Sequence, residues 1–277
     1  MIKACVIGWP ISHSRSPLIH NYWLAKYQIV GSYERVAVEP QNLENFLKNL
    51  DANGYVGCNV TLPHKEAAIA AIDQCDESVK TIGALNTVYV RGSKTYATST
   101  DGDGFLQNLL THVPNFTPKG KNITILGAGG SAKAIIHRLL KADVNSITVA
   151  NRTVSRAQDL RDNFGPKIIP IEIQNLTLET CDVLINTTSQ GMSGQPELKL
   201  NLSALPTTAI VTDIVYVPLK TQLLKTAEAR GNSIVPGLGM LLHQAVHGFE
   251  LWFGVKPEVT PELYALIARD IDPDFRP

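Results

Sequence analysis

Two residues of this 277-residue sequence have the types and settings that proton transfer requires, Lys65 and Asp101. Lys65 follows NVTLPH (59–64), where a predicted apolar strand runs into a turn set by proline, a place where α/β proteins present reactive side chains. Asp101 lies in STDG (99–102), at a predicted helix start. An ammonium beside a carboxylate can hold a proton next to a reacting oxygen, so the pair is a candidate acid and its orienting group. The alternatives are a solvated lysine and an aspartate that only caps the helix.

A glycine-rich turn predicts that the chain binds a dinucleotide. ILGAGGSA (125–132) has the pattern G-x-G-x-x-A between a predicted strand and a predicted helix. The first glycine permits a tight turn, the second lets the backbone approach a pyrophosphate, and the alanine lets the helix lie close to the sheet. The alternative is a glycine-rich connection without a ligand. The expected cofactor-binding residues are Gly127, Ala128, Gly129, Gly130, Ser131 and Ala132.

The residues after the next predicted strand favour NADP over NAD. NAD sites usually place an acidic residue there to bind the ribose 2′-hydroxyl. This chain instead has Asn151, Arg152 and Thr153, with Arg156 one turn later. Arginine pairs with a 2′-phosphate through charge-assisted hydrogen bonds, whereas a carboxylate would repel it. The alternative is a helix start that carries surface arginines.

Further polar residues are candidates for binding a substrate of the nicotinamide cofactor. Ser14 and Ser16 lie just before a predicted helix, where two hydroxyls suit a carboxylate. Ser16 as a plain N-cap, with Ser14 in solvent, is the alternative. Asn86 lies amid apolar neighbours in a predicted hairpin, where an amide either stabilises the structure or binds substrate hydroxyls.

A histidine pair with metal-ligand spacing is not expected to bind a metal. His243 and His247 lie four residues apart on a predicted helix, and Glu250 could be a third ligand. The zinc-protease pattern needs a glutamate base at the position that Gln244 occupies here, and an amide cannot serve as that base. We therefore expect no metal site and interpret Gln244 as facing the substrate.

The elements that must position these residues alternate between strand and helix, which predicts an α/β fold with mostly parallel sheets. In the first hundred residues we expect strands at 3–8, 32–39 and 55–62, helices at 16–27, 40–50 and 66–72, and a hairpin over 84–100 that turns at Gly92 and Ser93. Beyond them we expect strands at 121–126, 182–189 and 209–216, one ending at Ala150, and helices at 220–231, 236–255 and 261–271.

The length predicts two domains of about 150 residues each. We expect a substrate-binding catalytic domain over 1–103, completed by 238–277, and a Rossmann-type cofactor domain over 104–237. The junctions fall near the glycines of 101–104 and of 236–239.

The composition argues against several functional classes. Twenty-five basic and 25 acidic residues give a formal net charge of zero, which argues against a nucleic-acid-binding or polybasic membrane protein. No apolar run reaches about 18 residues, and the N-terminus lacks the features of a signal peptide. The four cysteines form no CxxC pair, which is typical of buried thiols in a reducing compartment. We therefore expect a cytoplasmic location; the oligomeric state stays open, with a homodimer among the alternatives.

Seven motifs in order resemble those of the shikimate dehydrogenase family: SHSRSP, NVTLPHKE, GALNT, STDG, ILGAGGSAKA, NRT and PGLGML. They span nearly the whole chain, from Gly8 to about Trp252. The resemblance implies an α/β substrate domain and a Rossmann-type NADP domain flanking a cleft. It also implies the reversible NADPH-dependent reduction of 3-dehydroshikimate to shikimate, a step of aromatic amino-acid biosynthesis through chorismate. The alternatives are a dual quinate/shikimate dehydrogenase that uses NAD and a non-catalytic NADP-binding regulator.

The resemblance also implies a role for each matching residue. Lys65 and Asp101 match the catalytic pair, Ser14 and Ser16 the carboxylate-binding serines, Thr61, Asn86 and Gln244 the hydroxyl-binding positions, Tyr216 a residue near the carboxylate, and Gly237 and Met240 the loop beside the nicotinamide. Ser99 departs from the family, which usually has asparagine there. His64 is interpreted as an exposed or supporting residue and not as a base.

Overall fold

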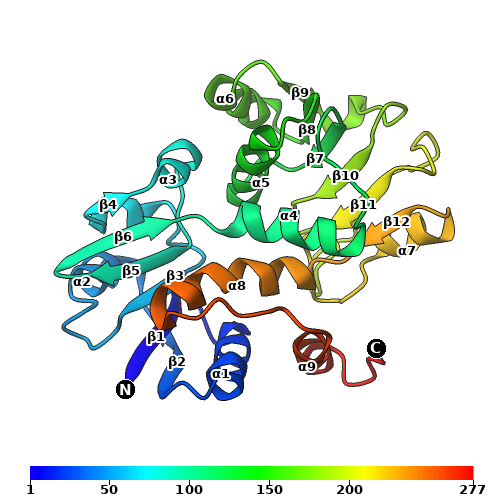
Figure 1. Cartoon of the computed structure of the whole chain (residues 1–277). Helices are drawn as coiled ribbons and strands as arrows, with labels where there is room; N and C mark the ends of the chain where they lie inside the picture. The colour runs from blue at the N-terminus through cyan, green and yellow to red at the C-terminus, as the bar shows by residue number, and fades with distance from the viewer. Residues whose placement is uncertain (277) are drawn as a thin grey trace. The chain divides into compact units, whose positions relative to one another are not determined.

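The computed structural model describes residues 1–276, which form two compact units. Unit 1 contains Met1–Asp101 and Gln244–Ile267, and unit 2 contains Gly102–His243 and the chain from Ala268. The compact units change after Asp101, inside the junction predicted at 101–104 and at the start of helix α4 (Asp101–His112). They change again before Gln244, within helix α8 (Leu238–Phe253), beyond the junction predicted at 236–239. Figure 1 shows both helices and the sheet of each unit.

The sheet of unit 1 is mixed. Its described strands are β1 (Ile2–Gly8), β2 (Gly31–Ala37), β3 (Gly57–Val60), β4 (Gln74–Cys75), β5 (Thr87–Arg91) and β6 (Lys94–Thr98), in the order β2-β1-β3-β5-β6-β4. Strand β1 pairs in parallel with β2 and β3, and β5 pairs antiparallel with β3 and β6. The predicted hairpin is confirmed, because Arg91 pairs with Lys94 across a turn in which Gly92 has a φ of 60°.

One face of this sheet is covered by α2 (Leu43–Lys48), η2 (Ala67–Ala71) and α3 (Glu77–Ile82). The helix predicted over 66–72 is present as η2, which is a short 3₁₀ helix. Its two buried residues, Ala68 and Ala71, are three positions apart, and this spacing matches the three-residue turn of a 3₁₀ helix.

Aromatic rings contact one another beside the same sheet. His20 and Trp23 come from α1 (Ser16–Lys26), Tyr33 from β2, and Phe249 and Trp252 from the C-terminal half of α8. The His20 ring stacks on the Tyr33 ring with centroids 4.0 Å apart, and Trp252 Nε1 donates to the Val88 carbonyl at 2.9 Å. The end of α8 therefore belongs to unit 1.

His20 should make the fold sensitive to acid. Its side chain is fully buried, and burial lowers its pKa from 6.5 to about 3. Between these pH values the unfolded chain binds a proton that the folded chain refuses, so stability falls as the pH drops below 6.5 and is unaffected above it. At pH 5 the loss is about 2 kcal/mol. His20→Phe should reduce the difference between urea midpoints at pH 7 and pH 5, whereas His13→Gln, at an exposed histidine, should leave it unchanged.

The sheet of unit 2 is parallel throughout the described chain. Its strands are β7 (Asn122–Leu126), β8 (Ser146–Asn151), β9 (Ile168–Glu172), β10 (Val183–Asn186), β11 (Ile210–Asp213) and β12 (Ser233–Val235), in the order β12-β11-β10-β7-β8-β9. Reversed, this is the 3-2-1-4-5-6 order of dinucleotide-binding folds, which confirms the Rossmann-type prediction. The two edge strands, β9 and β12, were not predicted from the sequence. Strand β9 contains Pro170, which argues against a central strand but is tolerated at a sheet edge.

Two apolar clusters pack around this sheet. One combines α4, α5 (Gly130–Lys141) and α6 (Val154–Phe164) with residues of β7 and β8, and the other contains α7 (Gln222–Ala229). Helix α9 (Pro261–Ile271) is the last described helix of the chain. Within residues 1–276, no helix has both the length and the apolar character that crossing a membrane requires.

Candidate active site

The strand pairing of unit 1 gathers its candidate residues at one edge of the sheet. Ile7 of β1 pairs with Val60 of β3, so the loop after β1 and the turn after β3 begin side by side. Asn59 lies opposite Thr87, and because β3 and β5 are antiparallel the residues just before β5 reach the same edge. The segments that carry the two serines, the lysine and Asn86 therefore meet there.

Lys65 and Asp101 form an ion pair in which Lys65 Nζ donates to Asp101 Oδ2. The two side chains are only 23% and 13% exposed, so solvent screens the pair less than it screens a surface pair. The Lys65 carbonyl accepts a hydrogen bond from the Leu85 N–H at 2.9 Å, which ties the turn after β3 to the residue preceding Asn86. The structure therefore brings together Lys65 and Asp101, the pair suggested by the sequence.

Asn86 is the centre of the polar cluster around this ion pair. Its Nδ2 donates to Asp101 Oδ1 at 2.9 Å, to Thr100 Oγ1 at 2.9 Å and to Gln244 Oε1 at 3.2 Å. Its Oδ1 accepts from the Thr100 N–H at 2.9 Å, and Thr100 Oγ1 donates to the Gln244 carbonyl at 2.9 Å. These contacts hold Asp101 and Gln244 in one hydrogen-bonded group.

The two serines lie together at the start of α1. Ser14 Oγ donates to Ser16 Oγ at 3.3 Å, and Arg35 Nε donates to the Ser14 carbonyl at 2.8 Å. The N-cap interpretation of Ser16 is wrong, because Arg15 is the N-cap and Ser16 is the first residue of the helix. Thr61 follows β3, with its N–H bonded to the Ile7 carbonyl at 3.0 Å. Hydroxyls and a helix start suit an anion, and the nearby ion pair suits proton transfer.

Some polar residues of this group were missed in the sequence. Asn59 is buried and its Nδ2 donates to the Asn86 carbonyl at 3.1 Å, while Thr100 contacts Asn86 directly. The detectable signal was a single amide inside the apolar strand GCNV. His64 is buried rather than exposed, and its Nε2 hydrogen-bonds to the Val38 carbonyl at 2.7 Å, which leaves it outside the proton-transfer pair.

The glycine turn of unit 2 has the geometry that a dinucleotide requires. Gly127 has a φ of +101°, and a Cβ there would lie 2.9 Å from Thr187 Oγ1, so only glycine fits. A Cβ at Gly129 or Gly130 would meet no atom within 4 Å, which leaves open space beside the start of α5. Ala132 is fully buried and brings α5 close to the sheet. The turn therefore fits a bound pyrophosphate.

The residues at the end of β8 lie beside this turn. Leu126 pairs with Ala150, so the segment that follows each strand starts at the same sheet edge. Asn151 Nδ2 donates to the Thr153 carbonyl at 2.8 Å, and Thr153 is the N-cap of α6. Arg152 and Arg156, one turn apart, are exposed and lie at the position where a 2′-phosphate is recognised. This donor set fits NADP.

A buried polar cluster at the ends of β10 and β11 was not recognised in the sequence. Asp213 Oδ1 accepts from Asn186 Nδ2 at 3.0 Å and from the Val215 N–H at 3.0 Å, and Oδ2 accepts from Thr221 Oγ1 at 2.7 Å. Burial raises the pKa of Asp213 above its ordinary value. The signal was a polar residue closing each of two apolar strands, VLIN and IVTD.

Three residues implicated by the family resemblance lie near this cluster. Tyr216 is half-buried and lies three residues after the end of β11 at Asp213. A Cβ at Gly237 would lie 2.5 Å from the Ile214 carbonyl oxygen, so the absence of a side chain lets the two segments touch. The Met240 N–H donates to the Gly237 carbonyl at 3.0 Å. Unit 2 therefore brings Gly237 and Met240 to the same edge as the end of β11.

The two histidines of α8 that have metal-ligand spacing each lie near another side chain. His243 Nε2 lies 3.5 Å from Thr111 Oγ1, and His247 Nδ1 lies 3.7 Å from Glu250 Oε2. Over the described part of the chain, no group of three or more His, Cys, Asp or Glu side chains is placed to hold a metal ion.

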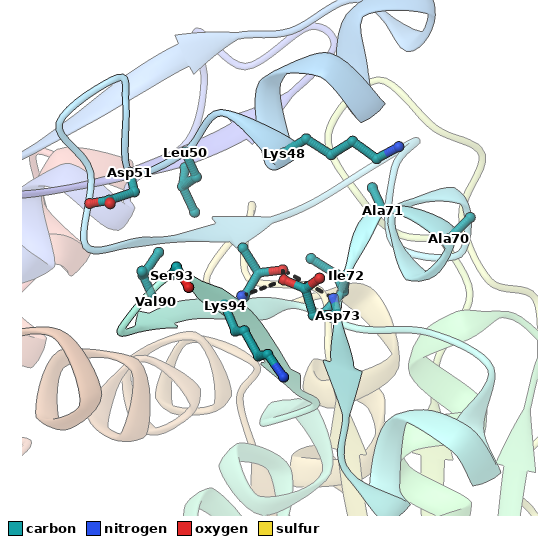
Figure 2. Close-up of a pocket in the computed structure, with 11 residues that line it drawn as sticks. Lys48, Leu50, Asp51, Ala70, Ala71, Ile72, Asp73, Val90, Ser93 and Lys94 are labelled. Carbon is teal, nitrogen blue, oxygen red and sulfur yellow. Dashed lines mark hydrogen bonds between the residues drawn. The ribbon is translucent and has the colours of Figure 1, made fainter.

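Unit 1 has a hollow of about 320 Å³ that is separate from the Lys65–Asp101 ion pair (Figure 2). It is lined by Leu50 and Asp51, which precede β3, and by the turn of the β5–β6 hairpin, whereas the ion pair follows the other end of β3. Two of its charged side chains have partners within the unit. Lys48 Nζ donates to Glu44 Oε1 at 2.6 Å, and the Asp73 carboxylate accepts two hydrogen bonds from Thr95, drawn as dashed lines. It shares no residue with the polar cluster around Asn86.

Models of known protein families match three segments of the chain. A model described as the shikimate dehydrogenase substrate binding domain matches residues 6–88. A model of shikimate/quinate 5-dehydrogenase matches residues 111–196, and one of the shikimate 5′-dehydrogenase C-terminal domain matches residues 237–261. The chain belongs to the shikimate dehydrogenase family.

Relatives within the shikimate dehydrogenase family match nearly the whole chain. A protein of Rhodopseudomonas palustris strain TIE-1, named shikimate dehydrogenase (NADP(+)), is 49% identical over 98% of this chain and 97% of its own length. The shikimate 5-dehydrogenase structure from Thermus thermophilus, in complex with NADP(H) and shikimate, is 33% identical with a TM-score of 0.86, over 98% of this chain and 100% of that one. Quinate dehydrogenase from Corynebacterium glutamicum, in complex with NAD, is 29% identical with a TM-score of 0.89, over 96% and 98%.

Proposed function

We propose that the protein catalyses the reversible reduction of 3-dehydroshikimate to shikimate with NADPH, a step of aromatic amino-acid biosynthesis through chorismate. The observation that carries this proposal is the half-buried ion pair between Lys65 and Asp101, held by Asn86 and adjoining Gln244. The names of the relatives that match nearly the full chain support the same substrate and cofactor.

The substrate has a carboxylate, ring hydroxyls and a carbonyl, and unit 1 offers a group for each. The hydroxyls of Ser14 and Ser16, at the start of α1, bind the carboxylate. The amides of Asn86 and Gln244 and the hydroxyl of Thr61 position the ring hydroxyls. The family resemblance assigns Tyr216 to a position near the carboxylate.

The proton step is assigned to the ion pair. NADPH, when bound, supplies the hydride that the carbonyl carbon accepts. The carbonyl oxygen then requires a proton, which Lys65 Nζ donates; in the reverse direction Nζ accepts it from the hydroxyl. Asp101 orients Nζ through its hydrogen bond and also contacts the substrate hydroxyl next to the reacting carbon.

Unit 2 supplies the cofactor site. The turn from Gly127 to Ala132 and the first N–H groups of α5 bind the pyrophosphate. Asn151, Arg152, Thr153 and Arg156 surround the adenosine ribose and its 2′-phosphate, and Gly237 and Met240 contact the nicotinamide end.

Arg152 should decide between the two nicotinamide cofactors. Arg152→Ala removes a charge-assisted contact with the 2′-phosphate, so the KM for NADP should rise about 10- to 100-fold while the KM for NAD stays unchanged. Steady-state rates with each cofactor test this. Arg161→Ala, at an exposed arginine later on α6, is the matched control and should change neither value. Equal losses with both cofactors would show that Arg152 does not contact the phosphate.

The function itself is tested by following cofactor reduction optically with shikimate or quinate, each with NADP or NAD. Shikimate with NADP should give the highest kcat/KM. A preference for quinate with NAD would favour the activity named for the Corynebacterium glutamicum relative. Tight NADPH binding without turnover of either substrate would identify a regulator instead.

We also propose a cytoplasmic location. All four cysteines are free, and Cys5, Cys58 and Cys181 are buried, in keeping with a protein that works in a reducing compartment.

A further inference from the structure

The hydroxyl of Tyr33 begins a buried chain of hydrogen bonds that ends on Asp101. Tyr33 Oη donates to Asn59 Oδ1 at 2.6 Å, and Asn59 Nδ2 donates to Thr87 Oγ1 at 3.2 Å and to the Asn86 carbonyl at 3.1 Å. Thr87 Oγ1 donates to Asn86 Oδ1 at 3.2 Å. Asn86 Nδ2 then donates to Asp101 Oδ1 at 2.9 Å.

The bonds of this chain run in one direction from the phenol, and two backbone groups favour the same amide orientations: the Asn86 carbonyl, which accepts from Asn59 Nδ2, and the Thr100 N–H, which donates to Asn86 Oδ1 at 2.9 Å. Burial raises the pKa of Tyr33 well above its ordinary value, so the phenol keeps its proton and acts as a donor. An amide that accepts through Oδ1 must point its Nδ2 the other way, which fixes Asn59. Thr87 Oγ1 accepts from Asn59 and so directs its own proton to Asn86 Oδ1. The Nδ2 group of Asn86 is thereby left facing Asp101.

Tyr33 is itself held in place on both its backbone and its ring. Asn21 of α1 accepts from the Tyr33 N–H at 3.0 Å and donates to the Tyr33 carbonyl at 2.9 Å. The ring stacks on His20 with an interplanar angle of 16° and is 2% exposed. A hydroxyl fixed this firmly can fix the amide that it contacts.

We propose that Tyr33 is a positioning residue for the reaction: its hydroxyl orients the Asn59 amide and, through Thr87 and Asn86, the carboxylate of Asp101. This inference rests on the proposed function, because the groups at the end of the chain are the ones assigned to the substrate hydroxyls and to the proton step. Tyr33 touches none of the reacting atoms and acts only through these neighbours.

Tyr33→Phe keeps the ring stack and removes only the donor. Asn59 Oδ1 is then buried without this partner, and the amide is held only through its Nδ2 contacts with the Asn86 carbonyl and Thr87. The kcat/KM for shikimate should fall about tenfold, whereas the KM for NADP should not change, because the residues assigned to the cofactor lie in unit 2. The control is Tyr55→Phe, whose hydroxyl donates to Glu34 Oε1 at 2.5 Å on an exposed part of the unit, and its rates should stay within about twofold.

A double-mutant cycle separates positioning from a general loss of stability. If Tyr33 acts through Asn86, Tyr33→Phe should cost less than about twofold in an Asn86→Ala background, since the relay is already broken there. The same tenfold loss in both backgrounds, or no loss in the wild-type background, would overturn the inference.

A second readout does not depend on turnover. In ¹⁵N–¹H spectra, the side-chain amide signals of Asn59 and Asn86 should move in Tyr33→Phe and remain in place in Tyr55→Phe. Unmoved signals would refute the inference even for an inactive protein. Moved signals together with a wild-type protein that does not turn over shikimate would support the relay and reject the proposed function.

Discussion

Replacing Lys65 with alanine is expected to lower kcat about 1,000-fold while the KM for shikimate changes only a few-fold. The Lys65 ammonium donates to Asp101 Oδ2 and is the group assigned to protonate the substrate's carbonyl oxygen. An alanine side chain has no proton to donate. The groups assigned to substrate binding keep their contacts, Ser14 with Ser16 and Asn86 with Asp101. Steady-state rates in both reaction directions measure the split between kcat and KM.

The matched control is Lys94→Ala, at a lysine beside the hairpin turn in the hollow of Figure 2. It removes the same side chain from the same unit at the opposite end of β3, and both constants should stay within about twofold. A large rise in KM with an unchanged kcat for Lys65→Ala would make Lys65 a binding residue, and the proton donor would have to be sought elsewhere.

Residues whose role depends on their own backbone setting could be predicted from the sequence. Gly127 follows a buried strand and precedes a helix, and that local context alone requires the positive φ that the structure has. Lys65 follows a strand and a proline-set turn, which places its side chain at a sheet edge. Asp101, at a predicted helix start, was the candidate partner of Lys65 before the family resemblance supported it, and the structure brings the two side chains together.

Residues whose role depends on pairing between distant segments could not be predicted. Asn59 and Thr87 interact because β3 and β5 are antiparallel in one particular register, and a pattern of apolar residues does not fix that register. The role of Asp213 could not be predicted for the same reason, since its partners Asn186 and Thr221 come from different segments of unit 2. Each of these residues is a polar group in or at the end of an apolar strand, and buried polar groups need partners.

This difference also explains why the two kinds of site residue should respond differently to substitution. Gly127 acts through its own backbone, so its contribution is separable from that of its neighbours. Asn86 and Asp101 share hydrogen bonds, so removing either changes what the other can do. Non-additive effects are therefore the signature to look for at the ion pair.

Asp101→Asn is expected to lower kcat about 100- to 1,000-fold although the side chain keeps its shape. Asn86 Nδ2 donates to Oδ1 of residue 101, so the asparagine must present its carbonyl oxygen on that side. Its NH₂ group then takes the place of Oδ2 and faces the Lys65 ammonium, which also has only donors. Lys65 loses its orienting partner and meets a repulsive one. Steady-state rates with shikimate and NADP measure the loss.

Asp103→Asn is the matched control, two residues along the same helix, where the carboxylate is 72% exposed and pairs with Arg138 Nε at 2.6 Å. It should leave kcat within about twofold, because an exposed ion pair contributes little. Combining Asp101→Asn with Lys65→Ala should give an enzyme no slower than the worse single variant, since either change already disables the pair. Losses that multiply would mean that the two residues act at separate steps, and the proposal that Asp101 orients Lys65 would have to be abandoned.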